Sequence, residues 1–412
     1  LPMEQIIEEK VEAKRTDILP TLLDFACGAG HFLTEAIAEI HAASEQVELA
    51  RLTGRAKTKF NRGREASGWA GDHIFGIDRD QRLAKVTKIA MFLNGDGEAN
   101  VIHADGLAPF AASSGYPKAL CSKTPGRLGT FDMVVANPPF SVSNFRRNVE
   151  DGASRFRLYQ HLSPDSGEIE CLFLERCSQV LRGGGTAGII FPLSLLGNQR
   201  AIYKAARRIL AIDFELCGLL ELREKTFIAT PTTTVCCFLK RRTDEDILAA
   251  VNALRPLTAT RKARLEAAGV SVDALRAAIE AANTDDDAAL VDAAYDDDSL
   301  AHAIRVVADG DAATVLGFSG DSVQEQQRAL GYRFSRSRGS EGYEEFEEDG
   351  VPQTLLYDAA SLHNEGRLSG AVLARMEGRT PQIPDDEGLD QHLKVVDTAK
   401  VWKMDSGCIE NP

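Results

Sequence analysis

The sequence has few of the features that place a protein outside the cytoplasm. Its eight cysteines include no CxxC pair, and Cys236 and Cys237 are adjacent, a spacing that suits neither an easy disulfide nor a zinc site. Long hydrophobic runs are lacking too, since the most apolar stretch, 188–196, contains Pro192 and is far shorter than the ~20 residues of a membrane-spanning helix. No N-terminal signal peptide is visible. These absences predict a cytoplasmic protein with reduced thiols, no metal site and no membrane partner.

Positive charge is also scarce overall. The chain carries 47 Lys and Arg against 61 Asp and Glu, which gives a net charge of −14 and a pI of about 5.2. This balance argues against a stand-alone nucleic-acid-binding protein. Two acidic stretches, at 285–298 and 344–349, are typical of solvated surfaces. Because they repel phosphate, we expect them to lie away from any DNA.

One short segment departs from this acidic balance. Between 51 and 64 the chain carries six cations, punctuated by glycines and with no acid among them. The segment holds few apolar residues that could anchor it to a core, so a mobile loop is expected. Two interpretations stay open for it. It is either a solvated surface loop or a contact with DNA phosphates made by Arg55, Lys57, Lys59 and Arg62.

The order of apolar segments indicates how the chain is organised. A length of 412 residues allows about two to three domains. Strands are predicted at 21–25, 73–77, 100–103, 131–136, 187–191, 214–222 and 233–239, and helices at 32–40, 83–93, 169–181 and 202–210. This alternation predicts an α/β domain on a mostly parallel sheet at 1–242. A helical acidic insertion or subdomain is expected at 243–320, and a mixed, polar C-terminal region at 321–412.

A glycine-rich turn follows the first predicted strand. Asp24 ends the strand, and Gly28 and Gly30 precede the first helix. Such a turn lets backbone amides approach a ligand at the carboxyl edge of a sheet. A dinucleotide-binding turn would have a third glycine where this sequence has Leu33. A ligand-binding turn and a tight turn without a ligand both stay open.

Acidic residues end the next two predicted strands. Asp78 follows the second strand, a position at which a carboxylate accepts hydrogen bonds from ribose hydroxyls. Asp78 could also serve only as a helix cap. Asp105 follows the third strand and either contacts an adenine edge or shapes a turn. Together with the glycine turn, these strand ends predict a nucleoside pocket.

The tetrapeptide Asn137-Pro138-Pro139-Phe140 ends the fourth predicted strand. Two consecutive prolines cannot donate backbone hydrogen bonds, so they stop the strand and stiffen the chain. The Asn137 side chain and the Pro138 carbonyl offer two acceptors, and Phe140 offers an aromatic face. This set suits a planar amino group held on a stacked base. Accepting its protons moves the nitrogen lone pair out of the ring plane, so no strong base is needed.

These motifs together resemble those of the S-adenosylmethionine-dependent N6-adenine DNA methyltransferases. Asp-x-Ala-Cys-Gly-x-Gly followed by Asn-Pro-Pro-Phe carries the resemblance. The segments "GIDRDQRLAKVTKIAMFLNGDGEANVIHADGL", "FIATPTTTVCCFLKR" and "GYRFSRSRGSEG" are similar to parts of the methylation subunit of type I restriction-modification systems. The resemblance implies a Rossmann-like methyltransferase that acts on N6 of adenine in duplex DNA. It also implies DNA and a sequence-specificity subunit as partners, and a restriction nuclease subunit that can join them.

The functional residues of that family carry over where this sequence matches its motifs. The resemblance gives Asp24, Ala26, Cys27, Gly28 and Gly30 to the methionine moiety of S-adenosylmethionine, Asp78 to its ribose and Asp105 to its adenine. It gives Asn137, Pro138, Pro139 and Phe140 to the target base, with Phe227 against the flipped base. Residues 321–412 would contact a partner or DNA.

Two departures from the family pattern and three alternatives accompany this interpretation. Phe25 stands where the family usually has proline, and the family's Phe-Thr-Pro segment and N-terminal helical domain are absent. A truncated subunit with reduced cofactor affinity is therefore expected. The alternatives are a protein glutamine methyltransferase, which shares Asn-Pro-Pro, and a scaffold that no longer binds the cofactor. The third, a dinucleotide oxidoreductase, is disfavoured by the missing third glycine.

Overall fold

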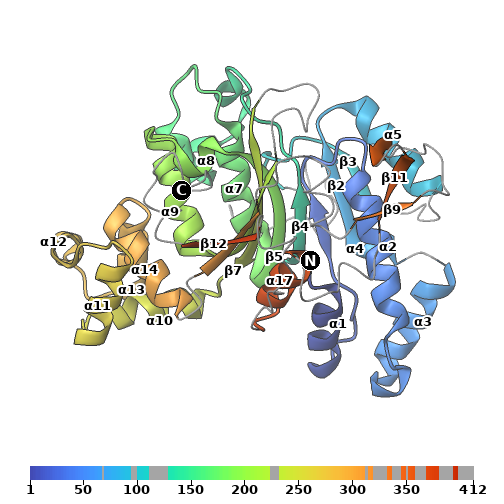
Figure 1. The fold of residues 1–412 in the computed structure, drawn as a ribbon, viewed down its shortest axis with the longest axis horizontal. Helices are drawn as coiled ribbons and strands as arrows, with labels where there is room; N and C mark the ends of the chain where they lie inside the picture. Colours follow the sequence, from blue (N-terminus) through green and yellow to red (C-terminus); the bar gives the residue numbers. More distant parts are fainter. Residues whose placement is uncertain are drawn as a thin grey trace.

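A nine-stranded sheet forms the centre of the computed structural model (Figure 1). The structure describes residues 1–66, 69–93, 100–110, 129–222, 232–310 and 368–379, and the strands at 314–318, 332–335, 345–348, 351–357 and 393–397. The strand order is β12-β8-β6-β7-β5-β4-β1-β2-β3. The strands are β1 (Leu22–Asp24), β2 (Ile74–Asp78), β3 (Asn100–His103), β4 (Phe131–Ala136), β5 (Leu181–Pro192), β6 (Phe214–Leu222), β7 (Thr234–Arg241), β8 (Thr314–Phe318) and β12 (Leu393–Asp397).

Strands β7 and β12 run antiparallel to their neighbours, and the other pairs are parallel. The predicted α/β fold with a mostly parallel sheet is therefore confirmed. The order reverses between β1 and β4, which are paired neighbours. In such sheets a ligand binds at the carboxyl ends of the strands, where the order reverses. The strands β9 (Tyr332–Ser335), β10 (Glu345–Glu348) and β11 (Val351–Tyr357) form a separate antiparallel sheet.

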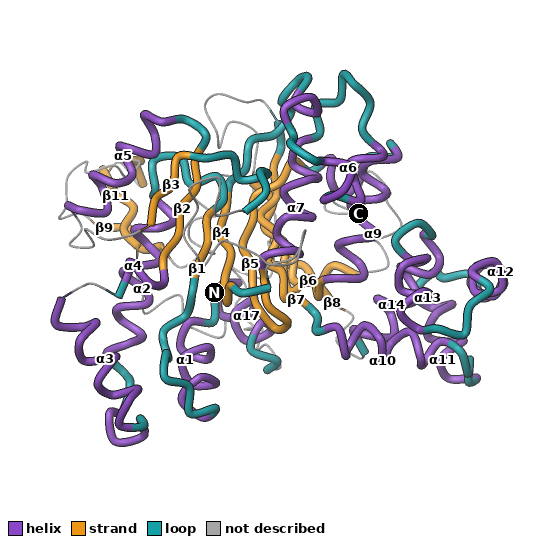
Figure 2. Tube along the Cα trace, turned by 180° about the vertical axis from the view of Figure 1, so that it is seen from behind, coloured by secondary structure: helices purple, strands orange, loops and turns teal. Residues whose placement is uncertain are grey.

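Helices cover both faces of the central sheet (Figure 2). Leu22 and Leu23 point to opposite faces, as successive strand residues do. Leu22 packs in the core cluster of α1 (Met3–Glu12), α2 (His31–Glu45) and α5 (Gln81–Leu93). Leu23 packs in the cluster of α7 (Ile169–Val180) and α9 (Ala201–Asp213). The predicted helices at 32–40, 83–93, 169–181 and 202–210 are all present. Among the described residues, no helix has the length and apolarity needed to cross a membrane.

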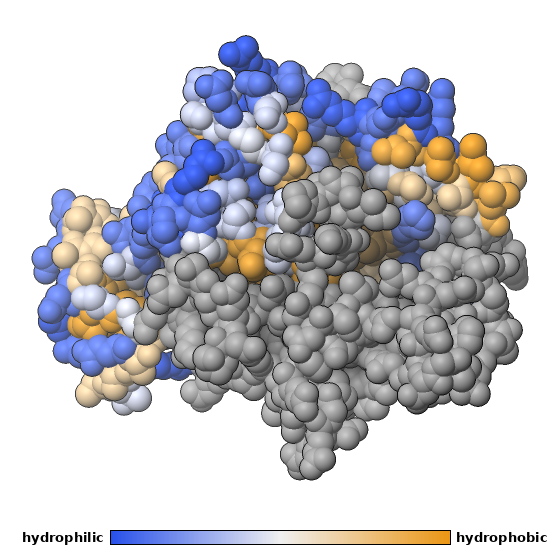
Figure 3. Space-filling view, turned by 45° about the horizontal axis from the view of Figure 1, so that its top comes forward, coloured by the Kyte–Doolittle hydropathy of each residue, from blue (hydrophilic) through white to orange (hydrophobic). Residues whose placement is uncertain are grey.

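The most apolar side chains of α5 lie on its outer face. Ala84, Thr87 and Met91 are the residues that α5 buries. The large residues Leu83, Val86, Ile89, Phe92 and Leu93 are 39% to 77% exposed. At the upper right of Figure 3, an apolar patch lies over this helix. The helix was predictable from its periodicity, but the face that it buries was not.

Five further helices follow β7 in the chain. They are α10 (Asp244–Leu254), α11 (Ala259–Ala267), α12 (Val272–Ala282), α13 (Asp287–Ala294) and α14 (Asp298–Asp309). Part of the acidic stretch caps them, since Asp286 and Asp297 accept hydrogen bonds from the first turns of α13 and α14. Their buried residues belong to the same core cluster as those of α9. The division of the chain at 242 and 320 stays a prediction.

The basic segment at 51–64 is not a loop. Residues Gly54–Ala66 form the helix α3, after the short helix η1 (Leu49–Arg51). Thr53 accepts a hydrogen bond from the Ala56 amide at 3.3 Å, which caps the helix start. Ala56 and Phe60, four residues apart, are both buried and anchor one face. The expectation of a mobile loop is therefore wrong, because two apolar residues at helical spacing are enough to fix this segment.

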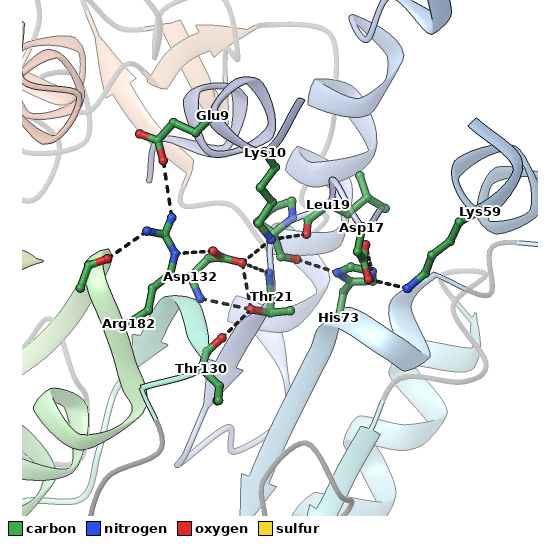
Figure 4. Close-up of polar contacts among 12 residues, drawn as sticks. Glu9, Lys10, Asp17, Leu19, Thr21, Lys59, His73, Thr130, Asp132 and Arg182 are labelled. Carbon is green, nitrogen blue, oxygen red and sulfur yellow. Dashed lines mark hydrogen bonds and ion pairs between the residues drawn. The ribbon is translucent and has the colours of Figure 1, made fainter. Parts of the chain in front are cut away.

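Two polar networks, one around the buried Asp132 and one around Asp17, hold the amino-terminal edge of the sheet (Figure 4). Asp132, at the start of β4, accepts hydrogen bonds from Lys10 at 2.6 Å, the Thr21 amide at 2.8 Å and Arg182 at 2.6 Å. Burial alone would raise the pKa of Asp132, but Lys10 and the other donors hold it below its usual range. Asp17 pairs with His73 and Lys59 in the same region. These contacts join α1, α3, β4 and β5 below the strands.

Candidate active site

The glycine turn between β1 and α2 requires two glycines for different reasons. Gly28 and Gly30 have φ angles of +54° and +86°, a region that side chains other than glycine rarely adopt. A Cβ atom on Gly30 would lie 2.5 Å from the Thr87 Cγ2 atom. A Cβ atom on Gly28 would meet nothing within 4 Å, so open space lies over that residue. The turn therefore leaves room for a ligand against the backbone of Gly28.

Asp78 and Thr87 fix this turn to the rest of the sheet. The Gly28 amide donates to Asp78 Oδ2 at 2.9 Å, and the Asp80 amide donates to Oδ1 at 2.7 Å. Thr87 donates its hydroxyl proton to the Gly28 carbonyl at 2.6 Å. Sequence reasoning missed Thr87, because the face that α5 buries does not follow from the apolar periodicity of the helix. Each Asp78 oxygen can accept a second hydrogen bond, so the carboxylate can also bind a ligand.

Asp24 lies fully buried beneath the turn. Its side chain accepts a hydrogen bond from the Ala26 amide at 2.9 Å. Burial raises the pKa of Asp24 to about 8, and the nearby negative charge of Asp78 adds to that rise. Among the described residues, neither Asp24 nor Asp78 has a cation in an ion pair. This part of the site is therefore suited to a positively charged ligand.

The other predicted cofactor residues also lie at this edge. Ala26 is partly buried, and the Cys27 amide donates to the Ile77 carbonyl at 2.9 Å. Burial, and then the charges of Asp24 and Asp78, raise the pKa of the Cys27 thiol, so it stays protonated. Asp105 accepts from the Leu107 amide at 2.9 Å and lies 3.9 Å from the Arg79 guanidinium. Cys27 thus acts through its backbone, and Asp105 stands beside Asp78 at the end of β3.

Phe25 has a structural role in the turn. Its ring stacks on Phe173 of α7 with 5.3 Å between centroids, and it is buried in the core. A Cβ atom on Gly106 would lie 2.2 Å from the Phe25 carbonyl oxygen, so the chain after Asp105 passes directly over this residue. The aromatic ring therefore anchors the start of the turn where the family pattern has proline.

The tetrapeptide after β4 lies beside the glycine turn, because β4 and β1 are paired. Pro138 is buried, Pro139 is exposed, and Asn137 and Phe140 are partly exposed. The Asn137 Oδ1 atom is itself buried and has no hydrogen-bond partner among the described residues. Leaving a buried acceptor unpaired costs about 1–3 kcal/mol. An amide held in this way is ready to accept a proton donor from a ligand.

The structure brings most of the predicted site residues to one edge and leaves the basic helix at the other. The ends of β1, β2, β3 and β4 meet at the top of Figure 1, whereas α3 lies at the bottom. Lys59 pairs with Asp17 below the strands (Figure 4), and Arg55 and Lys57 are exposed on α3. The backbone of Arg62 lies in α3, but its side chain is outside the described part. Phe227 also lies outside the described residues.

The sequence profile of the N-6 DNA methylase family matches residues 4–267. That match covers more than half of the chain, so the protein belongs to the N-6 DNA methylase family. The match includes both the glycine turn and the Asn-Pro-Pro-Phe segment. Comparison with curated proteins found no match.

Two solved structures are similar to this chain. The M protein of the type I restriction enzyme EcoKI is 18% identical, with 60% of this chain and 44% of that chain covered and a TM-score of 0.39. A methyltransferase subunit of a type I restriction-modification system from Streptococcus thermophilus is also 18% identical. There, 59% of this chain and 44% of that chain are covered, with a TM-score of 0.37. The matched part of this chain thus spans less than half the length of either protein.

Proposed function

We propose that this chain transfers a methyl group from S-adenosylmethionine to N6 of adenine in duplex DNA. The single observation that carries the proposal is the buried Asn137 Oδ1 atom next to the glycine turn, which has no hydrogen-bond partner in the part of the chain that the structure describes. An adenine amino group is a planar donor of the kind that this acceptor lacks. Membership of the N-6 DNA methylase family supports the same substrate.

The residues at the sheet edge fit S-adenosylmethionine. The open space over Gly28 admits a ligand against the backbone. Asp78 would present negative charge to a bound cation, and Asp24 would do so once that cation had lowered its pKa. Asp78 would hold the ribose hydroxyls, Asp105 the adenine, and the turn from Asp24 to Gly30 the methionine part. When bound, S-adenosylmethionine supplies an electrophilic methyl group on a positively charged sulfur. The partly exposed Asp78 carboxylate at this edge would disfavour the pyrophosphate of a dinucleotide, because like charges repel.

The protein's contribution to the reaction is to hold the amino group. Asn137 Oδ1 and the Pro138 carbonyl would accept its two protons, and Phe140 would stack on the base. The stiff proline pair keeps both acceptors in place, so the gain comes from orientation and proximity. The adenine must leave the DNA stack to reach this edge, as bases do in other base-modifying enzymes.

Labelled methyl transfer tests this function against its alternatives. The chain is incubated with radiolabelled S-adenosylmethionine and duplex DNA, with and without a sequence-specificity subunit, and the DNA is analysed for N6-methyladenine. Label in a protein glutamine instead would support a protein methyltransferase. Failure to bind S-adenosylmethionine in calorimetry would support a scaffold. Mapping N6-methyladenine in cells with and without the gene provides the same answer in vivo.

The partners of this activity are part of the proposal. The motif resemblance points to a modification subunit that works with a sequence-specificity subunit and DNA, and that a restriction nuclease subunit can join. A partner that contributes DNA affinity would reconcile the net charge of −14 with a DNA substrate. Residues 321–412 are proposed to contact that partner or the DNA.

Replacing Asp78 by alanine should weaken S-adenosylmethionine binding by about 1–3 kcal/mol, because hydrogen bonds to a charged acceptor are lost. The Gly28 amide would also lose its partner. Turnover at saturating cofactor should fall much less. Titration calorimetry and steady-state kinetics measure both quantities. Asp80→Ala is the matched control, since the Asp80 carboxylate bonds to Arg82 and to the Leu83 amide at the start of α5. Unchanged binding with collapsed turnover would show that Asp78 is not the ribose ligand.

The phosphate role proposed for the basic helix leads to a salt-dependence experiment. Changing Arg55, Lys57, Lys59 and Arg62 to Glu should weaken DNA binding by the whole complex and flatten its salt dependence. Each phosphate contact contributes about 0.9 to the slope of log affinity against log salt. Cofactor affinity should stay the same. A triple variant that keeps Lys59 is the control, because Lys59 pairs with Asp17 and its reversal would also affect folding. An unaltered slope would make α3 an ordinary solvated helix.

A further inference from the structure

Glu170 connects the first turn of α7 to the segment that follows Asn-Pro-Pro-Phe. Its side chain is buried, with 1% exposure. The Ser141 amide donates a hydrogen bond to Glu170 Oε2 at 3.3 Å. The Tyr203 hydroxyl of α9 donates to Glu170 Oε1 at 2.9 Å. Ser194, in the short helix α8 (Ser194–Gly197) after β5, donates to the Tyr203 oxygen at 3.3 Å.

Ser141 has a backbone conformation that needs support. Its φ angle is +58°, which is uncommon for a residue other than glycine and costs about 1 kcal/mol or more. Gly167, just before α7, lies against the Ser141 backbone, since a Cβ on it would be 3.7 Å from the Ser141 carbonyl carbon. The Ser141 amide is therefore held by a carboxylate in a turn that would not keep this shape on its own.

The tetrapeptide is thus fixed at both of its ends. At the amino end, β4 pairs with β1 and β5, with Ala136 opposite Ile189. At the carboxyl end, the next residue is bound by Glu170. Between these two points lie Asn137 and Pro138, the two acceptors of the proposed base site.

Burying a carboxylate has an unfavourable desolvation free energy. Burial raises the pKa of Glu170, while its hydrogen bonds with Tyr203 and Ser141 oppose that rise. Glu175, one turn further along α7, is also buried but caps the short helix η5 (Arg157–His161) through the Arg157 and Leu158 amides. Two similar acids on one helix therefore serve different segments. Of these two acids, Glu170 is the one that contacts the segment directly after the proposed base site.

We propose that Glu170 is a positioning residue that, with Tyr203, sets the geometry of Asn137 and Pro138 for the adenine amino group. The inference rests on the proposed function for its kinetic consequence. Glu170 would act without touching the base, because its contact with this segment is to the backbone amide of Ser141. The Tyr203 hydroxyl occupies the other carboxylate oxygen and so orients the first one toward Ser141.

The test compares Glu170→Ala with Glu170→Gln and Tyr203→Phe. The alanine variant should lose at least tenfold in kcat for adenine methylation, with its Kd for S-adenosylmethionine within twofold of wild type. The glutamine variant should recover most of that loss, because its amide oxygen still accepts from Ser141 and its NH2 group can donate to Tyr203. Tyr203→Phe should show a smaller loss. Glu175→Gln is the matched control and should leave kcat within about twofold.

Amide hydrogen exchange over 137–141 gives a second, activity-independent measurement. Exchange of the Ser141 amide should accelerate at least tenfold in Glu170→Ala and stay near wild type in Glu170→Gln. Unchanged exchange, unchanged kcat, or a loss that follows reduced thermal stability in all variants would overturn the positioning role. If wild type transfers no methyl group to adenine, the proposed function fails, and the exchange result alone decides whether Glu170 holds the segment.

Discussion

Asn137→Ala should abolish methyl transfer to adenine while leaving S-adenosylmethionine binding nearly intact. The reason is that Asn137 follows β4 and faces the proposed base position, whereas the residues proposed for the cofactor follow β1, β2 and β3. Removing its amide takes away one of the two acceptors for the amino protons. The measurements are turnover on duplex DNA and calorimetric titration with S-adenosylmethionine.

The expected loss is separable from unfolding. Among the described residues, Asn137 Oδ1 is buried without a hydrogen-bond partner, so its removal breaks no hydrogen bond to that oxygen. The thermal midpoint should therefore stay the same or rise. Asn148→Ala, an exposed asparagine in the same segment, is the control and should keep normal turnover. Turnover of Asn137→Ala within about tenfold of wild type, a change of roughly 1.4 kcal/mol in the barrier, would rule out the assigned role.

Asp24→Asn should stabilise the ligand-free protein and weaken cofactor binding at least tenfold. Burial raises the pKa of Asp24 from 3.8 to about 8 in the folded state. Between those two pH values the folded state keeps a proton that the unfolded state has lost, so wild-type stability falls as pH rises toward 8. Asparagine keeps the oxygen that accepts from Ala26 and removes the charge. The stabilisation should grow from about pH 4 to pH 8 and reach on the order of 5 kcal/mol, since each pH unit contributes about 1.36 kcal/mol.

Proton release on binding provides the sharpest measurement for Asp24. A cation bound beside the carboxylate lowers its pKa, so wild type should release a proton when S-adenosylmethionine binds near pH 7. Calorimetry in two buffers with different ionisation enthalpies detects that proton. The asparagine variant should release none, and Asp80→Asn, an exposed control, should behave like wild type. An Asp24→Asn protein that is less stable than wild type at pH 8 would contradict the assigned electrostatics.

Much of the fold could be predicted from the order of apolar segments. The strands that meet at the site follow from short β-branched or apolar runs ending in Gly28, Asp78, Asp105 and Asn137. The secondary structure of the basic segment at 51–64 could not be predicted from apolar segments in this way. Its glycines suggest a loop, but Ala56 and Phe60 bury one face of α3 and decide in favour of a helix. Tertiary packing overrides local propensity here.

The sequence predicted which residues lie at the candidate site better than it predicted their burial and pKa values. Motifs place Asp24 at the end of β1, but only the packing around it shows that its side chain is buried and its pKa raised. The supports lie far away in the sequence: Thr87 acts on Gly28, and Glu170 acts on Ser141. These two contacts join positions 59 and 29 residues apart in the sequence. They depend on how the chain folds, and no local sequence pattern predicts them.

Acidic side chains at the two edges of the central sheet differ in their charge partners, and this has a consequence for ligand choice. At the amino-terminal edge, Asp132 is matched by Lys10 and Arg182 within the chain. At the carboxyl edge, no described cation forms an ion pair with Asp24 or Asp78. Bound S-adenosylmethionine would supply positive charge at this edge. Demethylated S-adenosylhomocysteine has lost the sulfonium charge, so it brings one positive charge fewer. These acids would therefore bind S-adenosylmethionine more tightly than S-adenosylhomocysteine, which would favour release of the demethylated product.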